Sequence, residues 1–201
     1  IRNAFYNATN LSHVDFSRHT SLPFLELNTF KTVHPDCVIV VPTELYGTWN
    51  SSSEWGKRES MIIPNVEGKT IIDKNTNDNY MVAFNSPISM EFSTINFGED
   101  LNNAVATITC TTNDLLSIEN TEAESVNTVL GKLKVNLISA STVGTSDVTL
   151  TITSGDYVYT KTFTVEVVEQ LPMSWTVEAV DGAQYGFELN DSGYYESKNK
   201  G

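Results

Sequence analysis

The feature that most constrains the fold is an alternation of apolar and polar residues with a period of two, which runs from Tyr80 to Glu169. It is clearest in the stretches "AVATITC", "KLKVNL", "DVTLTIT" and "KTFTVEVVE". In "DVTLTIT", Val148, Leu150 and Ile152 alternate with threonines, a pattern typical of half-buried β-strands. The turn "TSGD" joins the last two stretches and predicts a hairpin. About seven such strands predict an antiparallel, immunoglobulin-like β-sandwich.

Composition along the chain divides the sequence into four parts. Residues 1–66 mix short apolar phrases with Asn, Ser and His, and residues 67–79, "EGKTIIDKNTNDN", are predicted to be a polar linker. Residues 80–169 form the predicted sandwich. Residues 170–201 contain one strand, "WTVEAV", and a hairpin in which "NDSG" joins "YGFEL" to "YYES". We expect this last part to be the incomplete start of a further β domain, and the whole sequence to be a piece of a longer protein.

The charge balance excludes several classes of partner. The chain has 25 acidic and 12 basic residues, a formal net charge of −13 and a pI near 4.5. Such a chain repels phosphate backbones and anionic lipid surfaces, so we expect no binding to nucleic acid or to a membrane surface. The sequence has no apolar run of 18 residues, so we also expect no insertion into a membrane. Cys37 and Cys110 are predicted to be buried free thiols, and a disulfide between them is the alternative.

Motifs for catalysis and metal binding are weak. "DKNTNDN" begins like a calcium loop at Asp73, but Asp78 replaces the glycine needed at the sixth position and Phe84 replaces the acid needed at the twelfth. The three histidines are too irregularly spaced for a helix-borne metal site. The sequence contains no nucleophile elbow and no phosphate-binding loop. We therefore expect no enzyme activity, no metal and no cofactor.

Aromatic residues near the C-terminus form a candidate ligand surface. Aromatic rings pack well on the apolar faces of sugars. The alternative is ordinary packing, because Tyr185, Phe187 and Leu189 alternate as one face of a strand. The candidate ligand-binding residues are Trp175, Tyr185, Tyr194 and Tyr195.

The first 65 residues resemble the terminal portion of BspA-like leucine-rich repeats. "AFYNATNLSHVDF" fills the repeating phrase of that family once. "DCVIVVPTELYGTWNSSSEW" is similar to the closing segment after the last repeat, with a final strand, "CVIVVP", and a short helix that carries "LYGTW". With about one repeat present, the concave binding face of such a stack is missing or lies upstream of Ile1.

The resemblance implies a structural role for the closing segment. A repeat stack exposes an apolar end unless an atypical unit covers it. Pro42 would end the strand and Thr43 would N-cap the helix. The residues assigned to the cap are Cys37, Ile39, Leu45, Tyr46, Trp49 and Trp55.

The remaining chain resembles modules of surface proteins. The sandwich region is similar to bacterial immunoglobulin-like modules of extracellular and phage structural proteins, and "YGFELNDSGYYESKN" resembles C-terminal modules of phage tail proteins. These resemblances imply a non-enzymatic, multi-copy structural and adhesion protein of a phage virion appendage. Its expected partners are other virion or surface proteins and host-surface glycans. The alternatives are a cell-surface adhesin of a gut bacterium and the accessory region of a secreted glycan-degrading enzyme.

Overall fold

The computed structural model describes residues 2–26, 28–169, 185–189 and 195–199. The chain divides into two compact units, residues 1–171 and 172–201. Within the first unit, residues 2–66 are called the repeat module here and residues 70–169 the sandwich module.

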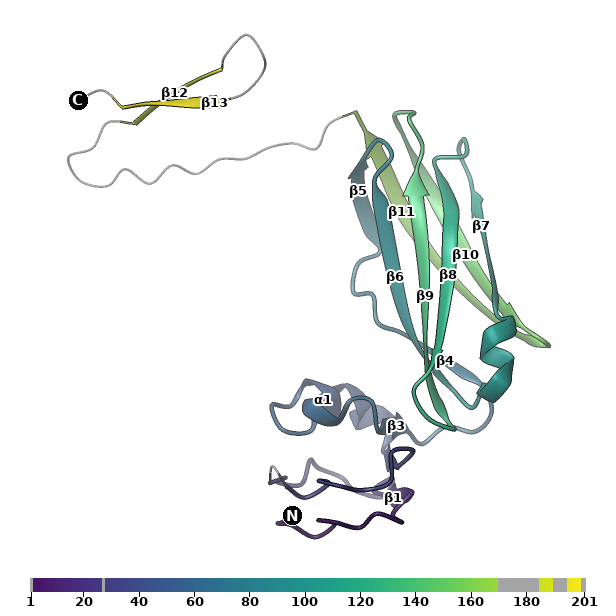
Figure 1. Ribbon diagram of the computed structural model, residues 1–201. Helices are drawn as coiled ribbons and strands as arrows, with labels where there is room; N and C mark the ends of the chain where they lie inside the picture. Colours follow the sequence, from purple (N-terminus) through teal and green to yellow (C-terminus); the bar gives the residue numbers. More distant parts are fainter. Residues whose placement is uncertain (1, 27, 170–184, 190–194, 200–201) are drawn as a thin grey trace. The chain divides into compact units, whose positions relative to one another are not determined.

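The repeat module is built on three short parallel strands (Figure 1), which are β1 (His13–Asp15), β2 (Val38–Val41) and β3 (Ile62–Pro64). Val14 lies opposite Ile39, 25 positions later, and Ile39 lies opposite Ile62, 23 positions later. This spacing lies in the range of leucine-rich repeats. The expectation that "CVIVVP" is the final strand is therefore wrong: β2 is central, and β3 follows it. Three residues are too few to show an alternation, which is why β3 escaped the sequence pattern.

A column of aromatic rings runs through the repeat module. Phe5, Phe30 and Trp55 follow one another at intervals of 25 residues, and their ring centroids are separated by 5.0 Å and then 5.9 Å. The backbone repeats in the same way, because Asn7 and Thr32 both have a positive φ, of 58° and 63°. The described chain thus contains three stacked rungs rather than the single repeat expected.

Three short helices lie between β2 and β3 in the repeat module, namely η1 (Thr43–Leu45), α1 (Tyr46–Ser51) and η2 (Gly56–Arg58). Thr43 was expected to N-cap a helix, but it does not. It is the first residue of η1, and its hydroxyl donates instead to the carbonyl of Asn65 at 2.8 Å. Trp49 and Trp55 are 0% and 1% exposed, with ring centroids 4.4 Å apart.

The other residues assigned to the cap also pack inside the repeat module. Cys37 and Ile39 are fully buried, and Leu45 and Tyr46 are partly buried against the core. Ile39 and Val38 belong to different clusters, as the alternation along this strand predicts. Both cysteines are free thiols; Cys37 is buried as predicted, whereas Cys110 is only half-buried.

The sandwich module has two four-stranded sheets (Figure 1). One has the order β4 (Thr70–Asp73), β6 (Pro87–Ile95), β9 (Leu130–Ser139), β8 (Leu116–Ser125). The other has the order β5 (Asn79–Ala83), β11 (Tyr157–Val168), β10 (Gly144–Ser154), β7 (Val105–Cys110). A short helix, η3 (Gly98–Asn103), precedes β7.

The strand order identifies the sandwich as immunoglobulin-like. With the strands lettered by their order along the chain and β5 left out, the first sheet has the order A (β4), B (β6), E (β9), D (β8) of a constant-type domain. The second sheet contains its C (β7), F (β10) and G (β11) strands. β5 adds to the second sheet and pairs with β11 in parallel. The predicted fold class, mainly β with an antiparallel immunoglobulin-like sandwich, is confirmed. The alternation predicts an inward face formed by Val148, Leu150 and Ile152, and all three side chains are 0% exposed.

The tract predicted to be a linker contributes to the sandwich. Ile71 in β4 lies opposite Thr94 in β6, so residues 70–73 are part of a sheet rather than of a linker. Four residues with only two apolar positions carry too little pattern to be recognised as an edge strand.

The second unit contains an antiparallel pair, β12 (Tyr185–Leu189) and β13 (Tyr195–Asn199), where the hairpin was predicted. The predicted strand "WTVEAV" lies outside the described residues. Across the described parts of the chain, no helix is both long and apolar enough to cross a membrane.

The two buried tryptophans should respond differently to the same substitution. Nε1 of Trp55 donates to the carbonyl of Pro23 at 2.7 Å, whereas Nε1 of Trp49 has no partner among the described residues. Trp55→Phe should therefore lower the free energy of unfolding by about 1 kcal/mol more than Trp49→Phe, because it leaves a carbonyl without its donor. Urea denaturation of the two variants measures the difference, and equal losses would contradict the assigned hydrogen bond.

Truncation of Trp49 should be much more costly. Because its ring is fully buried, Trp49→Ala should destabilise the repeat module by about 3–5 kcal/mol. The exposed Thr48 next to it provides the control, since Thr48→Ala should change stability little. A loss below about 1 kcal/mol for Trp49→Ala would mean that the ring is not part of the core.

Candidate functional site at the junction of the modules

The repeat module and the sandwich module share a small apolar core. Val38 in β2 and Ile63 in β3 pack with Ile95 at the end of β6 and Leu130 at the start of β9. These four residues, called the junction cluster here, are at most 7% exposed. The sheet face opposite the interior of the repeat stack is therefore covered by the sandwich module at its second and third strands. On β1, His13 and Asp15 remain exposed.

Polar contacts surround the junction cluster. The Lys74 ammonium pairs with the Glu59 carboxylate and lies 5.7 Å from the ring centre of Tyr46. Asn127 Nδ2 donates to the carbonyl of Ser60 at 3.4 Å. Burial lowers the pKa of Lys74, but the hydrogen bond and charge of Glu59 outweigh burial, so the net pKa is raised. Lys74 therefore stays charged and links the two modules.

A hollow of about 650 Å³ lies beside these contacts, against the outer face of the β4-β6-β9-β8 sheet. A smaller hollow of about 180 Å³ adjoins it and shares Glu59, Ser93 and Lys132. The charged residues that line the larger hollow are Glu59, Lys74, Glu91, Glu122, Glu124, Lys132 and Lys134.

The charges in this hollow follow the strand register. Glu91 lies opposite Lys134, which lies opposite Glu122, and in the next row Lys132 lies opposite Glu124. Opposite charges in direct register stabilise a sheet face. Lys132 and Lys134 make no ion pair within 4.0 Å to any described residue. The hollow thus offers ammonium and carboxylate groups to a polar partner.

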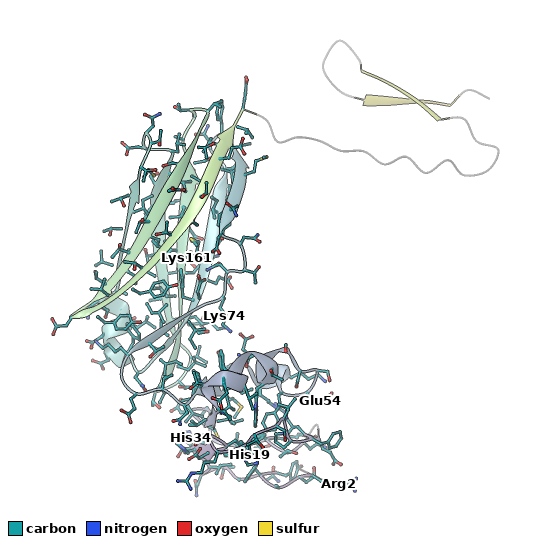
Figure 2. All side chains as sticks on the ribbon, turned by 180° about the vertical axis from the view of Figure 1, so that it is seen from behind. Arg2, His19, His34, Glu54, Lys74 and Lys161 are labelled. Atoms are coloured by element: carbon teal, nitrogen blue, oxygen red, sulfur yellow. The ribbon has the colours of Figure 1, made fainter. Side chains whose placement is uncertain are left out.

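The acidic residues of the tract considered as a calcium loop, Asp73 and Asp78, pair with a lysine of the same chain. Lys161 of β11, 9% exposed, lies within the sandwich (Figure 2). Its ammonium donates to Asp73 at 2.5 Å and is 3.1 Å from Asp78. The Tyr159 hydroxyl lies 3.4 Å from the same Asp73 oxygen. This group, called the Asp73–Lys161 clasp here, ties the first strand of the sandwich to its last.

The pKa shifts agree with a charged clasp. Burial raises the pKa of Asp73, but hydrogen bonds from Lys161 and Asn75 outweigh it and leave the pKa below its usual value. Burial lowers the pKa of Lys161, but its two acidic partners leave the pKa raised. Burial, with the charge of Asp73, raises the pKa of Tyr159 to about 12. Both partners of the clasp are therefore ionised at neutral pH.

Only two of the four candidate sugar-binding residues lie in the part of the chain that the structure describes. The backbones of Tyr185 and Tyr195 belong to β12 and β13, and the register places Tyr195 opposite Leu189. Trp175 and Tyr194 lie outside the described residues. A platform formed by these four residues stays a prediction.

Sequence reasoning missed Lys161, although a signal was present. Tyr159, Lys161 and Phe163 occupy the inward positions of one alternating stretch, and a charged residue at such a position needs a buried partner. The junction cluster left no comparable signal, because its four members come from four separate strands.

Comparisons with known proteins identify no family. No family model matches the sequence, and no curated protein matches it. Among solved structures, domains 4 and 5 of the S-layer protein SbsC are similar at 16% identity and a TM-score of 0.32, over 53% of this chain and 55% of that one. The chain therefore spans about half of that structure's length.

Two single-domain structures are also similar to this chain. The titin M3 domain matches at 12% identity and a TM-score of 0.28, over 48% of this chain and 95% of that one. The BIgI domain of beta protein from S. agalactiae, solved bound to CEACAM1, matches at 14% identity and a TM-score of 0.25, over 49% and 96%. The strand order and register described above remain the basis of the fold assignment.

Loss of the clasp should destabilise the sandwich in a pH-dependent way. Lys161→Met leaves Asp73 in a half-buried position without its charged donor, so the free energy of unfolding at pH 7 should fall by about 1–3 kcal/mol. The lowered pKa of Asp73 gives stability that is present above its unfolded pKa of about 3.9 and is lost as the pH falls through the folded value. The raised pKa of Lys161 gives stability that is present below about pH 10.4 and is lost as the pH rises through its folded value.

Urea denaturation at several pH values measures this effect. The stability difference between the wild type and Lys161→Met should be constant at neutral pH and should shrink below about pH 4. Lys134→Met is the matched control, because Lys134 has no ion pair among the described residues. A difference that does not change with pH would rule out an ionic clasp.

Proposed function

We propose that this chain is a non-enzymatic structural and adhesion protein of a phage virion appendage, such as a tail, baseplate or capsid decoration. In this role it stands in many copies beside other virion proteins and attaches the particle to glycans or proteins of the host surface. The observation that supports the proposal is the junction cluster, which joins a repeat stack and an immunoglobulin-like sandwich into one body.

A fixed junction suits attachment by many copies. Avidity arises only when several binding surfaces reach their targets at the same time, so each surface must be held at a suitable distance and orientation. A rigid spacer loses less conformational freedom on attachment than a chain of loosely linked domains. The junction cluster, with the Lys74–Glu59 pair beside it, provides this stiffness between the modules.

The charge of the chain suits a crowded particle surface. A net charge of −13 keeps neighbouring copies soluble and discourages non-specific binding to nucleic acid. The proposed location is accordingly the outside of a virion, with no part of the role in genome packaging.

A cell-surface adhesin of a gut bacterium is the second candidate. The observation in its favour is the parallel stack with 25- and 23-residue spacing, which supports the resemblance to BspA-like repeats. Both candidates use the same adhesive mechanism and differ in the particle that carries the chain.

Immunogold electron microscopy separates the two candidates. Antibodies raised against the full chain should label purified virions at repeated positions and leave the surface of uninfected host cells unlabelled. Labelling of the cell surface alone would overturn the virion proposal in favour of the adhesin. Labelling of neither would overturn both.

The junction cluster makes a testable prediction about unfolding. Val38→Asp places a charge in a cluster that is nearly dry, so the repeat module should undock and melt separately from the sandwich. Calorimetry should show one cooperative transition for residues 1–169 in the wild-type chain and two in the variant. Val143→Asp is the control, because Val143 is 62% exposed and the single transition should remain. Two separated transitions in the wild type would contradict a shared core.

A further inference from the structure

One strand of the sandwich has a free edge with unpaired backbone groups. β7 ends the order β5-β11-β10-β7, and no described strand lies beyond it (Figure 1). In an antiparallel pair, alternate residues direct their N–H and C=O groups toward the partner, and the bond from the N–H of Thr111 to the carbonyl of Asp147 sets this alternation for β7 and β10. Ala106, Ile108 and Cys110 therefore direct their N–H and C=O groups away from the sheet. These groups bond to no described residue.

The edges of the β4-β6-β9-β8 sheet are protected in ways that β7 is not. Proteins keep edge strands from pairing with other chains by charge, proline, short length or bulges. β8 carries Glu122 and Glu124, and its register shifts between Ile118 and Asn120. β4 has only four residues and ends in Asp73. β7, "VATITC", has six residues with no charge, no proline, no glycine and no register shift.

The sequence of β7 matches itself in antiparallel pairing. With a two-fold axis at Ile108, Ala106 lies opposite Cys110 of a second copy, so the outward N–H and C=O groups of each strand meet those of the other. Thr107 then lies opposite Thr109 of the second copy, and facing threonines stabilise a sheet. The paired segment contains no charged side chain, so the net charge of −13 opposes the pairing only from a distance, where salt screens it.

We propose that β7 is a self-association edge, to which a second copy of this chain adds its own β7 in antiparallel register. The two four-stranded sheets then form one continuous sheet across the two-fold axis. A second copy is the favoured occupant because this symmetric contact uses every outward backbone group of β7 on both partners. The inference goes beyond the proposed function and does not depend on whether a virion or a cell carries the chain.

The size of this contact makes it sensitive to concentration. A strand of six residues is about 20 Å long, so the edge buries less than the roughly 800 Å² per partner of a standard stable interface. The dimer is therefore weak in dilute solution. It forms where many copies stand close together, because their effective concentration is high there.

The other free edge of the same sheet provides the alternative contact. β5 also lacks a charge, but it has only five residues, and Asp78, with a side chain 73% exposed, directly precedes it. A contact between β7 of one copy and β5 of the next is not symmetric and does not close. It would give growing chains of copies rather than dimers.

Sedimentation velocity of the full chain over a series of concentrations tests the inference. The sedimentation coefficient should rise with concentration toward that of a dimer, with no larger species. Ala106→Pro removes an outward N–H and leaves the bonds to β10 in place, so its melting temperature should stay close to that of the wild type. By symmetry it removes two hydrogen bonds from the dimer, which should weaken dimerisation at least about tenfold.

Two exposed positions provide a second variant and its control. Thr107→Lys places two like charges beside the two-fold axis and should also weaken dimerisation, whereas Met81→Lys on β5 should not. A wild-type chain that stays monomeric at every concentration, or association that neither β7 variant weakens, would overturn the inference. Growing polymers, or association that Met81→Lys abolishes, would overturn it in favour of the β7–β5 contact.

Disulfide trapping tests the register. Facing residues between the ladder bonds have Cα atoms about 4.5 Å apart, which a disulfide can bridge. In chains whose Cys37 and Cys110 are replaced by alanine, a mixture of Thr107→Cys and Thr109→Cys should therefore form disulfide-linked dimers faster than either variant alone. Equal rates for the mixture and the single variants would contradict the antiparallel pairing about Ile108.

Discussion

The arrangement of this protein depends on the burial of Val38 and Ile63 against Ile95 and Leu130. Each such side chain contributes about 1.5–3 kcal/mol when it is fully removed from water. Together the four make undocking of the modules costly compared with thermal energy. The sheet face of the repeat stack is therefore covered by the sandwich at β2 and β3, whereas His13 and Asp15 on β1 remain exposed.

The two outer faces of the sandwich differ in the side chains that they expose. One face lies beside the junction and carries alternating charges, with Lys132 and Lys134 open to a polar partner. The other has rows of threonines, with the acidic Asp147 and Glu166 exposed on the same strands. Between the two sheets, the Asp73–Lys161 clasp ties the first strand to the last, which is a suitable place for a bond that resists strand separation. The same sandwich thus combines a polar hollow on one face with a charged internal tie between the sheets.

The parts that the sequence predicted well are those with a long pattern. The strands β7, β9, β10 and β11 follow from alternation over six or more residues, and that alternation also separates the core residues from the threonines. β3 and β4 were missed because three or four residues show no period. The 25-residue interval between Phe5, Phe30 and Trp55 was visible in the sequence and would have revealed the stacked rungs.

The candidate sites were harder to predict than the strands. The junction cluster joins residues that are up to 92 positions apart, and an apolar residue at the end of a strand carries no mark of the module that it will contact. The burial of Lys161 could have been predicted, because this residue interrupts an inward row of apolar residues. The rows of threonines across β7, β10 and β11 could not be predicted without the register, since only the pairing of β10 with both β7 and β11 aligns these residues.

The central claim is that the repeat module and the sandwich module form one rigid body. Double electron–electron resonance tests this claim directly, with spin labels on Lys31→Cys and Val143→Cys, two exposed positions in the two modules, in a chain whose Cys37 and Cys110 are replaced by alanine. A fixed junction predicts one narrow distribution of distances between the labels. A broad or multi-peaked distribution would contradict it and would mean that the junction cluster does not hold the modules together.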